Sequence, residues 1–433
     1  MGYRTRGLPV PPRQELGRPT RASQPRALLL LIRRLKLSRW VPPAAVTVLA
    51  IALLLWPSVL APREPIPVAE QETLNVGFTF SRRQAEYLGL PWHETFQAAV
   101  ELSPELIRLG AYWDEMERQP GDYDFSTLDW LLDQAARRDL QVILTVGMKA
   151  PRWPEYFLPR WLERRLVLPH GARVSDDALL RRYTLDFIEQ VVRRYRDREV
   201  IAYWQVENEP LDPSGPHRWR IGADFLAEEV ALVRMLDYRE RPIIVNMFVD
   251  THPLASLPPW RNDAERRART ILKVADILGL DVYPSLGIRI LSVDLYLNWS
   301  RWVWEKPVVE LQHLAHRQGK EAWVIEAQAE PWEPARVVYT DYHESKSVRP
   351  STAAGTFQRL QAAGFQTILL WGVEHWYMRL QRHEDASWWE KMGTFFVPNP
   401  NTTSTTKESE AVVAEPLADQ PPHATIERSP EAP

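Results

Sequence analysis

The chain has 433 residues, of which 45% are apolar and 25% are charged, and its formal net charge at pH 7 is −3. This length allows one large domain or two ordinary ones. The sequence contains no cysteine, which excludes disulfide bonds, thiolate metal sites and cysteine nucleophiles. Ten basic residues and one acidic residue stand in the first 40 positions, so the remainder is acidic and unsuited to a nucleic-acid surface.

The N-terminal region predicts a membrane anchor. Residues 1–40 form a basic tail, and residues 41–62 form an uncharged, mostly apolar run of about the ~20 residues that a spanning helix needs. Because the basic flank comes first, we expect a cytoplasmic N-terminus, a single pass through the cell membrane and a main domain outside. A cleaved signal peptide is the alternative, since Val59-Leu60-Ala61 resembles a cleavage site. Residues 63–71 are expected to form a linker.

Between residues 72 and 397, short apolar runs alternate with amphipathic helical patterns. Strands are predicted at residues 74–80, 106–111, 141–146, 201–206, 242–248, 277–282, 322–325 and 367–370. Helical stripes of apolar residues occur at 125–138, 178–195 and 225–236. Alternation of this kind implies a parallel sheet, and eight units predict an α/β fold of the (β/α)₈ TIM-barrel type. A doubly wound open sheet is the alternative. Residues 398–433 are predicted to be a disordered tail.

A candidate proton donor follows the fourth predicted strand, in the sequence Glu207-Asn208-Glu209-Pro210. Catalytic residues of parallel α/β barrels stand at the carboxyl ends of strands. Glu209 is therefore expected to act as general acid and base, and Asn208 to bind the 2-hydroxyl group of a sugar. Glu207 is expected to be a structural carboxylate paired with an arginine.

A candidate nucleophile follows the seventh predicted strand. Glu326 comes directly after Trp323-Val324-Ile325, whereas its competitor Glu330 lies four residues further on. Two carboxyl groups at strand ends that meet in space are the machinery of retaining glycoside hydrolysis, with the groups about 5–5.5 Å apart. In this scheme Glu326 attacks the anomeric carbon, while Glu209 protonates the leaving oxygen and then deprotonates water.

Three further residues are expected to support this pair. A cation best keeps the nucleophile ionised beside a second carboxyl group, and Arg108, within the second strand, is placed to supply it. Tyr283, after the sixth strand, is expected to donate a hydrogen bond to Glu326. Trp371, at the end of the eighth strand, is expected to form the floor under the reacting sugar.

The chain resembles the clan A glycoside hydrolases, which are retaining (β/α)₈ enzymes of cellulase-like and β-galactosidase-like families. The resemblance rests on Asn208-Glu209-Pro210, on Glu326, on Arg108 in Ile-Arg-Leu-Gly and on the segment 113–125, which is similar to a β-galactosidase motif after strand two. It covers about residues 72–396 and implies that Glu209 is the acid/base and Glu326 the nucleophile. It also implies that Arg108, Asn208, Tyr283 and Trp371 are subsite residues.

Two more tryptophans are expected to bind substrate, since an indole face suits the flat faces of sugar rings. Trp113 begins the motif segment, and Trp153 follows the third strand, where cellulase-like relatives often have a histidine. No metal or other cofactor is expected, because the histidines form no metal-ligand motif. The sequence thus predicts a membrane-anchored retaining glycosidase for β-linked glycans. The alternatives are a transglycosylase with the same residues and a non-catalytic glycan-binding barrel at the cell surface.

Overall fold

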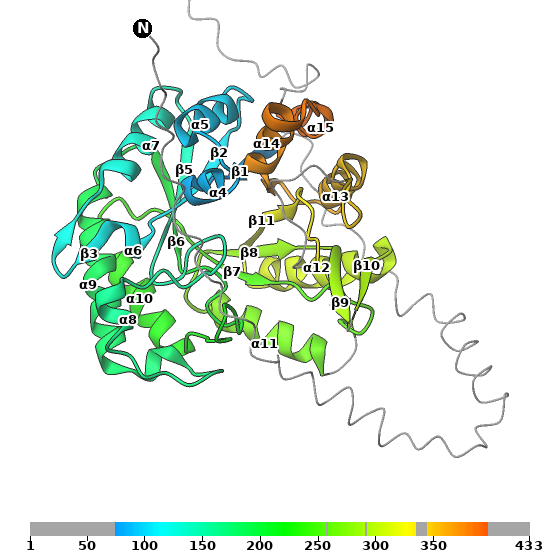
Figure 1. The fold of residues 1–433 in the computed structure, drawn as a ribbon. Coiled ribbons are helices and arrows are strands. Elements are labelled where there is room, and N and C mark those ends of the chain that lie inside the picture. The colour runs from blue at the N-terminus through cyan, green and yellow to red at the C-terminus, as the bar shows by residue number, and fades with distance from the viewer. Residues whose placement is uncertain (1–73, 257–258, 291, 335–343, 397–433) are drawn as a thin grey trace, which may run out of the picture. The chain divides into compact units, whose positions relative to one another are not determined.

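The computed structural model describes residues 74–256, 259–290, 292–334 and 344–396. Eight parallel strands form a closed barrel in the spatial order β1-β12-β11-β8-β7-β6-β5-β2 (Figure 1). The predicted (β/α)₈ barrel is therefore confirmed. Its strands are β1 (Asn75–Thr79), β2 (Leu106–Gly110), β5 (Gln141–Val146), β6 (Ile201–Val206), β7 (Ile243–Phe248), β8 (Ile277–Val282), β11 (Glu321–Gln328) and β12 (Thr367–Trp371).

The barrel closes through β1, which pairs with β12 on one side and with β2 on the other. Asn75 lies opposite Thr367, and Gly77 lies opposite Leu106. The strands are rich in branched apolar residues and are almost wholly buried, as expected for parallel strands that are covered on both faces. All eight match the predicted runs in chain order, so β6 is the fourth barrel strand and β11 the seventh.

Amphipathic helices surround the barrel, as α9 illustrates. Its Phe187, Val191 and Tyr195 are buried on one stripe, which recurs at helical spacing. The side chain of Asp177 caps its start by accepting a hydrogen bond from the backbone N–H of Leu180. The helices are α4 (Arg82–Tyr87), α5 (Trp92–Val100), α6 (Trp113–Met116), α7 (Ser126–Ala136), α8 (Arg160–Glu163), α9 (Ala178–Tyr195), α10 (Ala223–Leu236), α11 (Trp260–Leu272), α12 (Arg301–His316), α13 (Pro350–Ala362), α14 (Val373–His383) and α15 (Ser387–Gly393), with a 3₁₀ turn η1 (Val174–Asp176).

Two small antiparallel sheets lie outside the barrel, and the sequence patterns did not predict them. The strands β3 (Glu117–Gln119) and β4 (Asp122–Tyr123) form one, and β9 (Ser285–Ile290) and β10 (Val293–Asn298) form the other. The second hairpin leaves Ile290, Val293 and Leu295 exposed. The strands β3 and β4 have only three and two residues, too few for a periodic signal. The hairpin of β9 and β10 lengthens the connection after β8.

Among the described residues, no helix has both the length and the apolar character needed to cross a membrane. The expected basic tail at 1–40, the expected span at 41–62, the linker at 63–71 and the C-terminal tail at 398–433 all lie outside the described residues.

Candidate active site

The two candidate catalytic glutamates meet at the carboxyl ends of β6 and β11. Glu209 follows the last residue of β6 by three positions, and Glu326 lies near the end of β11, where the pairing register with β8 shifts. A bulge of this kind re-aims side chains. Carboxyl oxygens of Glu209, Glu326 and a third residue, Asp281, all lie within 4.8 Å of one another. The fold therefore brings the predicted pair together.

Glu326 is held by two donors, one on each oxygen. The Nη1 atom of Arg108 donates to its Oε1 over 2.6 Å, and the Tyr283 hydroxyl donates to its Oε2, also over 2.6 Å. Arg108 is fully buried, so its charge acts in a medium of low effective dielectric constant. Burial, followed by the charge of Glu326, raises the pKa of Tyr283 well above its ordinary value, so the phenol stays a donor. Both carboxyl oxygens of Glu326 therefore accept a hydrogen bond.

Arg108 also organises the other side of the site. Its Nη2 donates to Asn208 Oδ1 over 2.5 Å, and its Nε donates to Gln205 Oε1 over 2.7 Å. One guanidinium group thus fixes residues of β6 and of the segment after it while neutralising Glu326. This use of several donors in one plane is specific to arginine.

Glu209 stands in contrasting surroundings. Its backbone has φ of +45°, its N–H donates to Asn246 Oδ1 over 2.8 Å, and its carbonyl accepts from Lys149 Nζ over 2.7 Å. Within the described residues, no cation forms an ion pair with its carboxyl group. Burial, and then the negative charges of Asp281 and other nearby acids, raise the pKa of Glu209 well above its usual range. This carboxyl group is suited to carry a proton at neutral pH.

Among the residues that the structure describes, Glu207 pairs with no arginine, contrary to the sequence-based expectation. Its fully buried carboxylate accepts hydrogen bonds from the backbone N–H groups of Met148 and Lys149, at 2.8 and 2.6 Å, and contacts Glu229 of α10. The approach needs glycine at position 147, where φ is +127° and a Cβ would stand 2.2 Å from Glu207 Oε1. Burial raises the pKa of Glu207 to about 7. Glu207 therefore ties the segment after β6 to the segment after β5.

Sequence reasoning missed three polar residues of the site, Gln205, Asn246 and Asp281. Asn246 Nδ2 donates to Asn208 Oδ1 over 3.0 Å and to Asp281 Oδ2 over 2.6 Å, while its Oδ1 also accepts from Gln205 Nε2 over 3.1 Å. All three are fully buried in barrel strands. A polar residue inside an otherwise apolar strand, as in Ile243-Ile244-Val245-Asn246, was the available signal, because buried polar groups need partners.

Glu330, the alternative candidate for the nucleophile, has different hydrogen-bond partners from Glu326. Its Oε1 accepts from Arg152 Nη1 over 2.5 Å and from the indole N–H of Trp371 over 2.8 Å. Arg152 lies 4.0 Å over the Trp371 ring and also binds Glu374 over 2.5 Å. Trp371 is nearly buried, with its ring centroid 6.5 Å from that of Tyr283. Glu330 thus orients Trp371 at the edge of the site.

The two additional tryptophans lie in very different positions. Trp113 has no exposed surface, stacks on Phe187 at 5.1 Å and donates to Glu117 Oε2 over 2.6 Å. The expectation that Trp113 binds substrate is therefore corrected: a fully buried indole offers no face to a sugar. Trp153 is 69% exposed, so its indole ring is accessible to a sugar ring.

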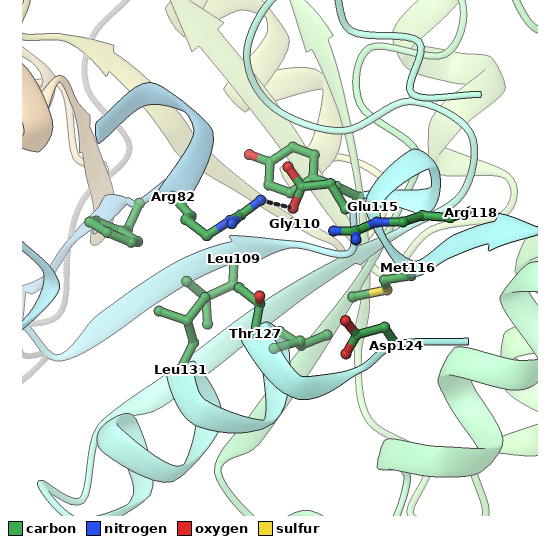
Figure 2. Close-up of a pocket in the computed structure, with 12 residues that line it drawn as sticks. Arg82, Leu109, Gly110, Glu115, Met116, Arg118, Asp124, Thr127 and Leu131 are labelled. Carbon is green, nitrogen blue, oxygen red and sulfur yellow. Dashed lines mark ion pairs between the residues drawn. The ribbon is translucent and has the colours of Figure 1, made fainter. Parts of the chain in front are cut away.

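A separate pocket lies between β2, α6 and α7, and Figure 2 shows the residues around it. The Arg82–Glu115 ion pair stands beside apolar side chains such as Leu109 and Leu131. The volume of this pocket is about 30 Å³. The residues that line it include neither Glu209 nor Glu326.

Comparison with known proteins places this site in context. The model of a family described as β-galactosidase matches residues 89–217. The chain is 25% identical over 133 residues to the β-galactosidase BgaA of Clostridium cellulovorans, covering 27% of this chain and 19% of that protein. It is 24% identical over 222 residues to putative mannan endo-1,4-β-mannosidase 5 of Oryza sativa, covering 47% and 43%. The chain thus spans about a fifth of the first relative and less than half of the second.

A solved structure is similar at the level of the chain path. The β-galactosidase Gan42B from G. stearothermophilus is 18% identical in the form described as a catalytic mutant, with a TM-score of 0.48 over 71% of this chain and 52% of that one. The matched family segment, 89–217, contains Arg108, Asn208 and Glu209. This match supports the resemblance to clan A glycoside hydrolases that was drawn from the sequence, and the closed parallel barrel confirms the predicted (β/α)₈ fold.

Proposed function

We propose that the chain is a retaining β-glycosidase with Glu326 as nucleophile and Glu209 as general acid and base. The observation that carries this proposal is the pair of carboxyl groups at the ends of the fourth and seventh barrel strands, with oxygens within 4.8 Å. Inverting enzymes hold their carboxyl groups about 6.5–9.5 Å apart to admit a water molecule, and retaining enzymes about 5–5.5 Å apart. The short separation favours the retaining mechanism.

The surroundings of each carboxyl group support its role. Arg108 and Tyr283 keep Glu326 as a carboxylate that attacks the anomeric carbon while Glu209 gives its proton to the leaving oxygen. The ester that forms removes the charge of Glu326. Glu209, which has lost its proton to the leaving group, then acts as base and deprotonates the water that releases the sugar.

The substrate class follows from the site and from the names of relatives. Asn208 is fixed by Arg108 and Asn246, and its free amide hydrogens suit a sugar hydroxyl group. The sequence relatives include proteins named β-galactosidase and mannan endo-1,4-β-mannosidase, so we propose β-linked hexose glycans as substrates. Trp371 and the exposed Trp153 are proposed to contact sugar rings by stacking.

We also propose that residues 41–62 anchor the chain in the cell membrane, with the N-terminus in the cytoplasm and the barrel outside. The uncharged run and its basic leading flank support this orientation. Protease added to intact cells is expected to digest the barrel and to spare an N-terminal epitope. Recovery of the uncleaved chain from the soluble fraction would contradict the anchor.

The activity is tested by incubating the full chain with a panel of aryl β-glycosides and β-linked oligosaccharides and following the anomer by NMR. We expect the β-anomer to form first, because two inversions restore the configuration. Longer oligosaccharides as products would instead indicate a transglycosylase. Binding of glycans without turnover would favour the non-catalytic barrel, and an α-anomer would exclude the retaining mechanism.

A further inference from the structure

Asp281 is a third carboxyl group at the site, and the chemistry proposed above gives it no role. It lies in β8 with no exposed surface. Its Oδ2 accepts a 2.6 Å hydrogen bond from Asn246 Nδ2. Its Oδ1 is buried and receives no hydrogen bond from an amide, hydroxyl or cationic group of the described residues. An unsatisfied buried carboxylate oxygen is costly, which points to a neighbour that can share a proton.

Glu209 is that neighbour. Carboxyl oxygens of Glu209, Asp281 and Glu326 lie within 4.8 Å of one another. Two carboxyl groups form a hydrogen bond only when one of them carries a proton. Glu326 does not need that proton, because Arg108 and Tyr283 already donate to both of its oxygens.

The charged and titratable groups around the pair do not replace this proton. Arg108 of β2 and Tyr283, after β8, are committed to Glu326, and Lys149, after β5, reaches the Glu209 carbonyl and Glu155. The remaining neighbours are acids: Glu326 of β11, Glu155 after β5 and Asp212 after β6, the last paired with Arg267. Burial and this negative charge raise the pKa of both Glu209 and Asp281.

We propose that Glu209 and Asp281 share one proton at neutral pH, and that Asp281 is a positioning residue which keeps Glu209 protonated as the general acid. The second half of this inference rests on the proposed glycosidase function. Asp281 also holds Asn246, whose Oδ1 binds the backbone N–H of Glu209. It therefore fixes both the proton and the position of the acid.

Over the proposed catalytic cycle, the Glu209–Asp281 pair loses one proton and regains one. As the bond between Glu326 and the anomeric carbon forms and the glycosidic bond breaks, Glu209 gives the shared proton to the leaving oxygen. The pair then carries two negative charges, while the charge of Glu326 is lost in the ester. When water attacks, Glu209 takes one proton from it, the ester breaks, and the pair again holds one proton.

The shared proton is tested without any activity measurement by infrared titration of the full chain. We expect Glu209→Gln to remove one protonated-carboxyl C=O band at neutral pH. Asp281→Asn should move the titration of that band to lower pH by about one unit, since it removes a like charge. The matched control is Asp276→Asn, because Asp276 lies just before β8, at the end opposite to the site, and binds Arg234. The protonated-carboxyl band of the site should titrate in this variant as it does in wild type.

An unchanged acid band in Glu209→Gln would overturn the inference, and this variant decides the question even if Asp281→Asn fails to fold. If the acid band of folded Asp281→Asn titrated as in wild type, Asp281 would not be the residue that keeps Glu209 protonated.

Kinetics separate this inference from the proposed function. In Asp281→Asn, the basic limb of the kcat/KM profile for a poor leaving group should move about one pH unit lower, with kcat affected more than KM. Asp281→Glu, which keeps the charge, should recover part of the shift. If Glu326→Ala and Glu209→Ala lose activity but the Asp281→Asn profile matches wild type, only the inference fails. If the wild type cleaves no glycoside, the function fails, and the infrared titration still decides whether the proton is shared.

Discussion

The ends of β6 and β11 present the same side chain, glutamate, in opposite surroundings. After β6, the backbone adopts positive φ at Glu207 and at Glu209, conformations that cost a non-glycine residue roughly 1–2 kcal/mol. Neither carboxyl group forms an ion pair with a cation among the described residues. At β11, Glu326 remains in the strand and is held by Arg108 and Tyr283.

This difference supports the proposed division of roles between Glu209 as acid and Glu326 as nucleophile. Burial and nearby acids raise the pKa of Glu209, whereas Glu326 forms a direct ion pair with the guanidinium group of Arg108. The strained turn after β6 is stabilised by Glu207, whose carboxylate binds two backbone N–H groups of the neighbouring segment. Each prediction below tests one side of this contrast.

The largest expected effect is that of Glu326→Ala. Removing the nucleophile should lower kcat by about 10⁴-fold or more, because no covalent intermediate can form. Azide should restore turnover of an aryl glycoside and give a glycosyl azide of inverted configuration, identified by NMR. Glu330→Ala is the matched control: it keeps the nucleophile, so its activity should not depend on azide. If azide restored the activity of Glu330→Ala and not that of Glu326→Ala, Glu330 would be the nucleophile.

Glu209→Ala should have the next largest effect, and the effect should depend on the leaving group. Activity on glycosides with poor leaving groups should fall by about 10²–10⁴-fold, whereas glycosylation by good leaving groups should change little. Azide should then yield a product of retained configuration. An equal loss on both kinds of substrate would argue against Glu209 as the proton donor.

A third prediction concerns stability and the Glu207–Glu229 pair. Burial raises the pKa of Glu207 from an ordinary 4.5 to about 7 and also raises the pKa of Glu229 well above its ordinary value. The folded state therefore binds more protons than the unfolded state above pH 4.5, so the unfolding free energy falls as the pH rises towards 7 and beyond.

Glu229→Gln removes one of these titrations and should raise the unfolding free energy at pH 8 by about 1 kcal/mol or more relative to wild type. Denaturant titrations at pH 5 and pH 8 measure this change. Glu228→Gln, at the exposed neighbouring position that binds Arg181, should leave the pH dependence as in wild type. If the unfolding free energy of Glu229→Gln fell with pH as steeply as that of wild type, the Glu207–Glu229 pair would not be the source of the pH dependence.

The smallest expected effect is that of chelation. The oxygens of Glu209, Asp281 and Glu326 are close enough to bind a cation, and carboxylate oxygens are the ligands that Ca²⁺ and Mg²⁺ prefer. We nevertheless expect EDTA to leave activity unchanged, because Arg108, Tyr283 and a shared proton already compensate this cluster. If EDTA abolished activity and Ca²⁺ or Mg²⁺ restored it, a bound metal ion rather than a shared proton would compensate the charge of this cluster.

The sequence by itself determined the barrel and its strand ends. Strand order and barrel class follow from local periodicity, since a buried parallel strand is a short apolar run and its covering helix has an apolar stripe. Glu209 and Glu326 stand next to such runs, and Arg108 lies inside one. Local patterns therefore identified which residues reach the carboxyl ends of the strands.

Only the tertiary structure decided which side chains meet there. Asp281 and Asn246 contact Glu209 across sequence separations of 72 and 37 residues, and no local pattern encodes such pairs. The sequence predicts an arginine partner for Glu207 and a substrate contact for Trp113, yet Glu207 binds backbone N–H groups and Trp113 packs on Phe187. Protonation depends on burial and on charges from distant strands, so the roles of identical glutamates are set only when the barrel closes.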